Sequence, residues 1–276
     1  MLAQGLPAPA NRDAAERMVR AVSSRGAVPA ITAVVHGVAT AGLEDKDLDR
    51  FLRREGIGKV SARDLPTAIA RNADGATTVA AAIVIATLAG IDVFATGGIG
   101  GVHRAVDAHS YDESADLVEM ARTPMLVVSS GAKSILDLPA TLERLETLGV
   151  SIIGYRTDEM PGFFTAETGL TLSTRTESVA EVAAVWRAHR ALGRQTAILV
   201  VQAPPADVAL PRRVVERAVE RALRAADTEG VHGSTLTPFL LAAVERETGG
   251  RSLGANLALL EANAMLAAEI AVELCA

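Results

Sequence analysis

The sequence has few aromatic residues, one cysteine and three lysines. Aromatic residues make up 3% of the 276 residues, so aliphatic side chains must supply most of the core. The single Cys275 excludes an internal disulfide framework and a thiolate zinc cluster. The N-terminus shows no basic stretch followed by an apolar core, so we expect no signal peptide and a cytoplasmic location.

Long apolar runs and an excess of positive charge are also absent. Every apolar run is interrupted well short of about 18 residues, so we expect no membrane span and no membrane partner. The net charge is −6 at pH 7, whereas a general nucleic-acid binder would show a basic stripe. We therefore expect neither a nucleic acid nor a membrane as a partner.

Apolar runs alternate with helical patterns along most of the chain. Five runs predict strands buried on both faces, as in a parallel sheet covered by helices: Val28–Val35, Ile91–Ala95, Pro124–Val128, Val150–Tyr155 and Ala197–Val201. Helices are predicted at Asn11–Val22, Ser61–Arg71, Thr78–Leu88, Ser134–Leu148, Ser178–Leu192, Pro211–Ala226, Pro238–Glu247 and Ser252–Glu273. This order predicts a single-domain three-layer α/β/α sandwich over residues 1–276, with a mostly parallel central sheet and a helical C-terminal part.

A glycine-rich stretch, ATGGIGGVHR, covers Ala95–Arg104 and follows a predicted strand. Glycines allow the backbone to approach a ligand closely and to present N–H groups to an anion. The stretch does not meet the dinucleotide-binding fingerprint, because His103 stands at the position of the third glycine. Two interpretations stay open: a tight turn after the strand, or a cradle for a phosphate or sugar phosphate.

An acidic cluster lies within HSYDESADL, His109–Leu117, where a helix is predicted to begin. Acidic residues at that place complement the helix dipole, which is the structural interpretation. The functional interpretation is a hard-cation site, because Asp112 and Asp116 are spaced i, i+4 and carboxylates bind Mg²⁺ or Mn²⁺. The sequence leaves both open.

Lys133 follows a predicted strand and has only small neighbours between Ser129 and Ser134. That edge of an α/β sheet commonly binds ligands, although a surface lysine is the ordinary alternative. An amine whose pKa is lowered can attack a carbon atom, and arginine cannot replace it because arginine does not deprotonate. Lys59 precedes a predicted helix cap at Ser61, so it is either an exposed cation or a phosphate ligand.

Several blocks together resemble the pseudouridine-5′-phosphate glycosidases, also called indigoidine-synthase-A-like proteins. The resemblance runs from about Gly5 to Ala271, in the blocks GKVSARDL, NADGATTVAA, VFATGGIGGVHR, SADL, GAKSILDLPATLERLETLGVSIIGYRTDEMPGFF, TPFLL and TGGRSLGANLALLEANA. It implies reversible cleavage of the C–C glycosidic bond of pseudouridine 5′-phosphate to uracil and ribose 5-phosphate, through a lysine Schiff base. It also implies one divalent cation per subunit, usually Mn²⁺, and a homotrimer.

The resemblance also assigns roles to individual residues. The nucleophile falls on Lys133 and the metal-binding aspartate on Asp112. Substrate-binding positions fall on Lys59, Val79, Ser114, Ala115, Asp116 and Asn256, and we add Thr96 and His103 as pocket candidates.

One part of the family pattern is missing from this chain. The family's proton-donor glutamate lies in an A-L-E-S-T-like strand ahead of a G-x-P-x-P-x-N stretch, which here is Gly5–Asn11. Met1 falls within that strand, a few residues after the place of the glutamate, and we expect the start site to have been assigned too late. Two alternatives follow: a catalytically impaired sugar-phosphate-binding protein, or another Schiff-base sugar-phosphate lyase.

Overall fold

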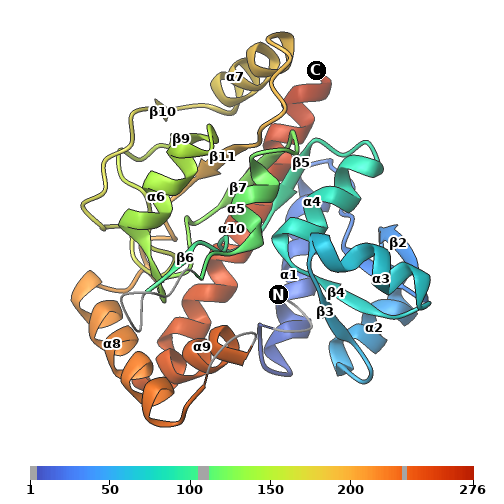
Figure 1. The fold of residues 1–276 in the computed structure, drawn as a ribbon. Helices are drawn as coiled ribbons and strands as arrows, with labels where there is room; N and C mark the ends of the chain where they lie inside the picture. The colour runs from blue at the N-terminus through green and yellow to red at the C-terminus, as the bar shows by residue number, and fades with distance from the viewer. Residues whose placement is uncertain (1–4, 105–111, 232–234) are drawn as a thin grey trace.

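The computed structural model describes residues 5–104, 112–231 and 235–276, and its main feature is a sheet of five parallel strands (Figure 1). The strand order is β10-β9-β11-β7-β5. The strands are β5 (Val93–Ala95), β7 (Leu126–Ser129), β9 (Ser151–Tyr155), β10 (Arg175–Thr176) and β11 (Ile198–Val201). Four of the five predicted apolar strands belong to this sheet, and the predicted parallel α/β architecture is confirmed.

Helices cover both faces of the five-stranded sheet. Val127 and Leu199 face a core shared with α5 (Ala115–Met120) and α6 (Leu138–Thr147). Leu126 and Val128 point to the opposite core, which includes side chains of α7 (Val179–Ala191) and α10 (Arg251–Cys275). Because successive strand residues alternate between the two cores, the central strands read as unbroken apolar runs in the sequence.

A second, smaller sheet has the order β2-β1-β4-β3. Its strands are β1 (Thr32–Val35), β2 (Val38–Ala41), β3 (Gly58–Val60) and β4 (Gly75–Thr77). Strand β1 is antiparallel to both β2 and β4, so the prediction that Val28–Val35 joins a parallel sheet is wrong. The His36–Gly37 turn, with φ of 47° and 76°, folds the chain back into a hairpin.

Helix α4 (Val79–Leu88) packs against both sheets. Val79 and Ile83 belong to the large core, whereas Ala81 and Ile85 belong to the core of the small sheet. Seven of its ten residues are buried, as expected for a helix made almost entirely of apolar residues. The single domain over residues 1–276 stays a prediction.

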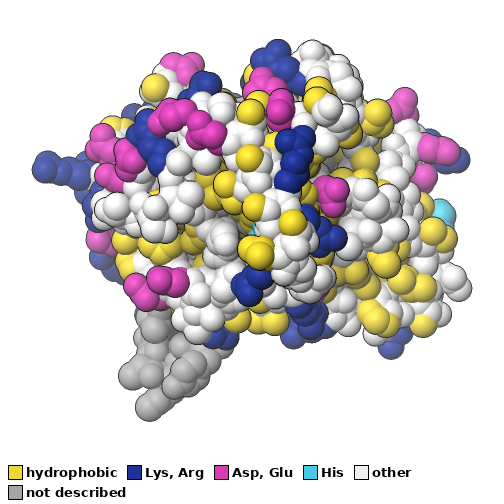
Figure 2. All heavy atoms as spheres, turned by 90° about the horizontal axis from the view of Figure 1, so that it is seen from above, with side chains coloured by type: hydrophobic (Ala, Val, Ile, Leu, Met, Phe, Trp, Pro, Cys, Tyr) yellow, Lys and Arg dark blue, Asp and Glu magenta, His cyan; other side chains and the backbone are white. Residues whose placement is uncertain are grey.

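The other helices follow the sequence patterns, with one correction at a helix start. The prediction that a helix begins at Ser134 is wrong, because β8 (Leu136–Asp137) first pairs with β6 (Val102–His103) and the Asp137 side chain then caps α6. The remaining helices are α1 (Ala10–Ser24), α2 (Asp45–Arg53), α3 (Leu65–Ala70), α8 (Arg212–Thr228) and α9 (Leu236–Glu247). Within the described residues no helix is long and apolar enough to span a bilayer. Figure 2 shows basic and acidic side chains interspersed over one face of the molecule.

Candidate active site

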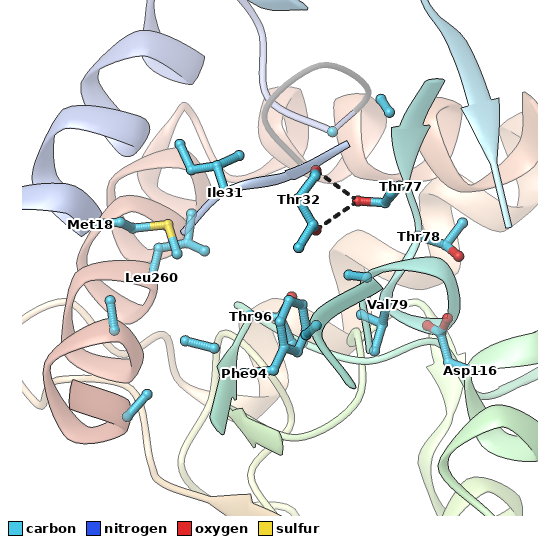
Figure 3. Close-up of a pocket in the computed structure, with 18 of the residues that line it drawn as sticks. Met18, Ile31, Thr32, Thr77, Thr78, Val79, Phe94, Thr96, Asp116 and Leu260 are labelled. Carbon is cyan, nitrogen blue, oxygen red and sulfur yellow. Dashed lines mark hydrogen bonds between the residues drawn. The ribbon is translucent and has the colours of Figure 1, made fainter. Parts of the chain in front are cut away.

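A cavity of about 1190 Å³ lies between the two sheets, next to the carboxyl end of β5. Its two sides differ: Met18, Ile31 and Leu260 form an apolar wall, whereas Thr78 and Asp116 lie across from them (Figure 3). All ten residues to which the sequence assigned a role line this one cavity: Lys59, Val79, Thr96, His103, Asp112, Ser114, Ala115, Asp116, Lys133 and Asn256. Their individual roles stay predictions.

Lys133 is presented by a tight turn after β7. Gly131 has a φ of +79°, and a Cβ atom there would lie 2.0 Å from the carbonyl oxygen of Pro161, so glycine alone fits this position. The N–H group of Lys133 donates to the carbonyl oxygen of Ile99 at 3.2 Å. The turn therefore ties the lysine to the glycine-rich stretch that follows β5.

The surroundings of the Lys133 amine favour its neutral form. Burial is the largest cause that lowers its pKa, the positive charge of Lys59 lowers the pKa further, and the carboxylate of Asp116 opposes both. Within the described residues the amine makes no hydrogen bond or ion pair. A neutral, unpaired amine that lines a cavity is a nucleophile.

The glycine-rich stretch lines the cavity and also packs closely against neighbouring side chains. A Cβ atom at Gly98 would lie 2.6 Å from the ring of Phe163, and one at Gly100 would lie 2.1 Å from Oγ of Ser114. Its N–H groups donate to acceptors within the protein at 2.8 to 3.0 Å from Ile99, Gly100, Val102 and His103. These four N–H groups are therefore already bonded within the protein, and both interpretations of the stretch stay predictions.

Asp116 links three segments of the chain below the cavity. It is 5% exposed, and its carboxylate accepts one hydrogen bond from the N–H of Ala80 (2.9 Å) and one from the N–H of Gly100 (2.8 Å). Its own N–H donates to Oγ of Ser114, which caps α5. Ala115 begins that helix and is exposed.

The pairing of Asp112 and Asp116 around a cation stays a prediction. Asp112 lies ahead of α5, outside the helix, so the i, i+4 relation does not place the two carboxylates together. Each oxygen of Asp116 accepts one hydrogen bond from an N–H group, whereas Asp112 is exposed. The beginning of the acidic stretch, at His109–Tyr111, lies outside the described residues.

His103 lies beside Asp112. Its N–H donates to the carbonyl oxygen of Asp112 at 2.9 Å, and its Nδ1 is 3.9 Å from the carboxylate of the same residue. Burial is the main cause that lowers the pKa of His103; Asp112 opposes it, and Lys133 and Lys59 reinforce it. The ring is therefore neutral at neutral pH, the form in which histidine binds a metal ion.

Asp112 and His103 suit a loosely held hard cation. No group of three or more histidine, cysteine, aspartate or glutamate side chains gathers as a metal site among the described residues. A cation here would take one carboxylate, an imidazole nitrogen at most, and otherwise water or substrate oxygens. Mg²⁺ and Mn²⁺ accept such sites, because they keep several bound waters.

The small sheet supplies the opposite side of the cavity. Lys59 lies in β3 with an exposed side chain. Thr78 caps α4 by accepting a hydrogen bond from the N–H of Ala81 at 3.3 Å, and Val79 is the first residue of that helix. A cation next to a helix N-terminus favours an anionic group such as a phosphate.

Thr96 and Asn256 approach the cavity from β5 and α10. Thr96 follows the last residue of β5 and is 7% exposed. Asn256 is 8% exposed, and its side-chain oxygen has no hydrogen-bond partner among the described residues. An unpaired buried acceptor costs about 1–3 kcal/mol, so this amide favours a ligand that donates a hydrogen bond.

Sequence reasoning missed two residues that shape the site. Phe163 is 1% exposed, has a φ of +64°, and packs its ring under Gly98. Asn263 is fully buried in α10 and bonds to Thr96 and Ser130. An asparagine within a mostly apolar helix is a sequence signal for a buried polar contact, whereas nothing in the sequence marks the φ of Phe163.

Comparison with known sequences gives full-length matches. The family described as "Indigoidine synthase A like protein" matches residues 1–273. A pseudouridine-5′-phosphate glycosidase of Gemmatimonas aurantiaca is 61% identical over 274 residues, which cover 99% of this chain and 89% of that protein. A protein of the same name from Herpetosiphon aurantiacus is 47% identical over 99% of this chain and 90% of its own length.

Solved structures agree with the sequence matches. An indigoidine synthase A-like protein of Thermotoga maritima superimposes with a TM-score of 0.91 at 37% identity, over 99% of this chain and 90% of that one. Prealnumycin C-glycosynthase, in complex with ribulose 5-phosphate, superimposes with a TM-score of 0.89 at 40% identity, over 95% of this chain and 86% of that one. From these full-length likenesses we conclude that the chain belongs to the indigoidine synthase A-like protein family.

Proposed function

We propose that this chain is a pseudouridine-5′-phosphate glycosidase. It would reversibly cleave pseudouridine 5′-phosphate to uracil and ribose 5-phosphate through an imine on Lys133. The observation that carries the proposal is the buried amine of Lys133, whose pKa is lowered by burial and which lines the cavity without a partner among the described residues. The two curated relatives, whose length this chain covers to 89% and 90%, carry the glycosidase activity in their names.

A carbon-linked base is a poor leaving group, because its departure places negative charge on a carbon atom. Covalent attack by an amine makes this departure easier. Attack of the neutral Lys133 nitrogen on the sugar C1′ forms a C–N bond, and the ring oxygen leaves and takes a proton. The nitrogen lone pair then expels the uracil carbon, which takes a proton from a placed acid, and an imine remains. Water adds to the imine and releases ribose 5-phosphate, which restores the amine. Two lower barriers replace one high barrier.

The small-sheet side of the cavity is suited to the phosphate. Lys59 contributes an exposed ammonium group, and Val79 stands at the N-terminus of α4. The glycine-rich stretch contributes little, because four of its N–H groups are already bonded. The phosphate then lies on one side of the cavity and C1′ near Lys133, so the two lysines fix the two ends of the sugar.

The proposal includes one divalent cation per subunit, with Mn²⁺ as the first choice. Asp112 would hold it, with His103 beside it, and it would supply positive charge next to oxygen atoms of the substrate. We also propose a homotrimer as the working assembly.

A second candidate is another Schiff-base reaction that joins or splits a sugar phosphate and a carbon nucleophile. The solved C-glycosynthase with its ribulose 5-phosphate favours this alternative, because its fold covers 95% of this chain. The large cavity, with its apolar wall at Met18, Ile31 and Leu260, offers room for an acceptor other than uracil.

The decisive experiment measures uracil release from pseudouridine 5′-phosphate with and without added Mn²⁺. Borohydride is then used to trap ribose 5-phosphate on the protein, and mass spectrometry locates the adduct. We expect release, and an adduct on Lys133 that is absent from the K133R variant. Trapping without uracil release supports the second candidate. If the protein binds ribose 5-phosphate but shows neither uracil release nor trapping, it is a catalytically inactive sugar-phosphate-binding protein.

A further inference from the structure

Asn263 lies fully buried in α10, where its amide contacts two loops of the active site. Its Nδ2 donates to the carbonyl oxygen of Thr96 at 2.9 Å, more weakly to that of Gly97 at 3.4 Å, and to Oγ of Ser130 at 3.2 Å. Its Oδ1 accepts from the side chain of Gln202 at 2.8 Å. The donors and acceptors of this amide are therefore all in use.

The partners of Asn263 follow three neighbouring strands of the parallel sheet. Thr96, Ser130 and Gln202 come directly after β5, β7 and β11, which lie in the order β11-β7-β5. One side chain thus joins the carboxyl ends of three strands, the edge at which the cavity opens.

Two of these contacts lead directly to Lys133. Ser130 precedes it by three residues, and the N–H of Ser130 donates to the carbonyl oxygen of Gly97 at 2.9 Å. The N–H of Lys133 donates to the carbonyl oxygen of Ile99 at 3.2 Å. The separation of the loops after β5 and β7 therefore sets the position of Lys133. Asn263 fixes that separation from α10, through its hydrogen bonds to Thr96 and Ser130.

We propose that Asn263 is a positioning residue, whose amide holds the loops after β5 and β7 together so that Lys133 faces the cavity. The inference rests on the proposed role of Lys133 in the reaction. Asn263 itself does not line the cavity, so it acts through Ser130 and the loops and not on the substrate.

Ser130 also contacts Phe163, a residue with a strained backbone conformation. Phe163 donates its N–H to the carbonyl oxygen of Ser130 at 2.9 Å while it adopts a φ of +64°. A non-glycine residue in that conformation persists only where its surroundings hold it, and such residues gather at active sites. Loss of the Asn263 amide leaves Ser130 with its backbone hydrogen bonds to Gly97 and Phe163 and without a side-chain partner in α10.

The test replaces Asn263 by leucine, which has a similar size but no hydrogen bonds. The matched control is S252A, because Ser252 is also buried in α10 and also hydrogen-bonded, to Oγ1 of Thr248 at 3.0 Å, but its contacts stay within the helical region. Three quantities are measured on folded protein: kcat and KM for uracil release, the pH midpoint of Lys133 labelling by an amine reagent, and thermal unfolding.

We expect N263L to lower kcat by about 100-fold, the scale of a misplacement of about 1 Å, and to change KM by less than about threefold. We expect the labelling midpoint of Lys133 to move upward, because a looser loop admits water while Lys59 and Asp116 still face the amine. S252A is expected to shift thermal unfolding without moving kcat or the midpoint.

If N263L fails to fold, Q202L replaces it, since that change removes one hydrogen bond at the rim of the network, and a kcat loss of about tenfold is expected. Unchanged kcat and an unchanged labelling midpoint in a folded variant overturn the inference. Absence of uracil release and trapping in the unsubstituted protein overturns the proposed function instead, and the labelling midpoint then still decides the role of Asn263.

Discussion

The two sheets each present one lysine to the same cavity, in opposite surroundings. Lys133 follows a strand of the parallel sheet in which every residue is buried. Lys59 lies within a short strand of the mixed sheet, and its side chain is exposed. Burial penalises an ammonium group, whereas water stabilises it, so the two lysines are suited to different tasks. In the proposed reaction, the parallel sheet provides the nucleophile and the mixed sheet a fixed positive charge for the phosphate.

The most direct way to break this comparison is to make the same substitution at both lysines. K133R is expected to reduce uracil release by more than about a thousandfold, because arginine does not become a neutral amine. K59R is expected to keep activity within about tenfold, because a guanidinium group still binds phosphate. Steady-state kinetics check both. Equal losses in the two variants would contradict the division of tasks.

Removal of the positive charge at Lys59 sharpens the comparison. K59M is expected to raise KM by about 10- to 100-fold, the range of a lost charged hydrogen bond, with a smaller change in kcat. It should also raise the pH midpoint of the reaction, because the charge of Lys59 lowers the pKa of Lys133. K46M is the control, since Lys46 is an exposed lysine away from the cavity. A fall in kcat alone would argue against phosphate binding by Lys59.

Substitution of Gly100 tests the packing where the glycine-rich stretch after β5 meets Ser114 and Asp116. In G100A the new Cβ atom would lie 2.1 Å from Oγ of Ser114 and 2.8 Å from Asp116, so we expect a loss of about 1–3 kcal/mol in the free energy of unfolding. G254A is the control, because a Cβ atom there meets nothing within 4 Å and alanine favours a helix by about 0.5–1 kcal/mol. Urea unfolding measures both. A stabilised G100A protein would contradict the packing described for the glycine-rich stretch.

The smallest expected effect concerns the stability cost of the buried amine. The pKa of Lys133 is lowered in the folded protein from its ordinary value of 10.5, so between the two pKa values the unfolded chain binds the proton more tightly. K133M should therefore unfold at a higher urea concentration than the unsubstituted protein near pH 7. The advantage should shrink as the pH rises toward about 10, where the unfolded lysine also begins to lose its proton. A difference that does not vary with pH would show that the gain comes from packing alone.

Much of the site could be predicted from the sequence because the relevant signals are local or occur in long blocks. Lys133 among small residues at a strand end, and Ser61 and Thr78 as helix caps, are visible within a few residues. The antiparallel pairing of β1 was not predicted, because an apolar run looks the same in both kinds of sheet and only the His36–Gly37 turn distinguishes them.

The contacts that hold the site together could not be predicted, because they join distant parts of the chain. Asn263 and Ser130 are 133 residues apart in the sequence, and no local pattern pairs them. The φ of Phe163 depends on the loop that Ser130 begins. The two oxygens of Asp116 likewise bind the N–H groups of Ala80 and Gly100, which are 36 and 16 residues away in the sequence.

The buried carboxylate of Asp116 also bears on how the molecule is assembled. Its two oxygens join the start of α4, which follows the small sheet, to the stretch that follows β5 of the large one. A chain in which only one of the two sheets has formed would lack one of these two hydrogen bonds and one side of the cavity. The cavity is therefore complete only when both sheets are in place, because each of them supplies one of its sides.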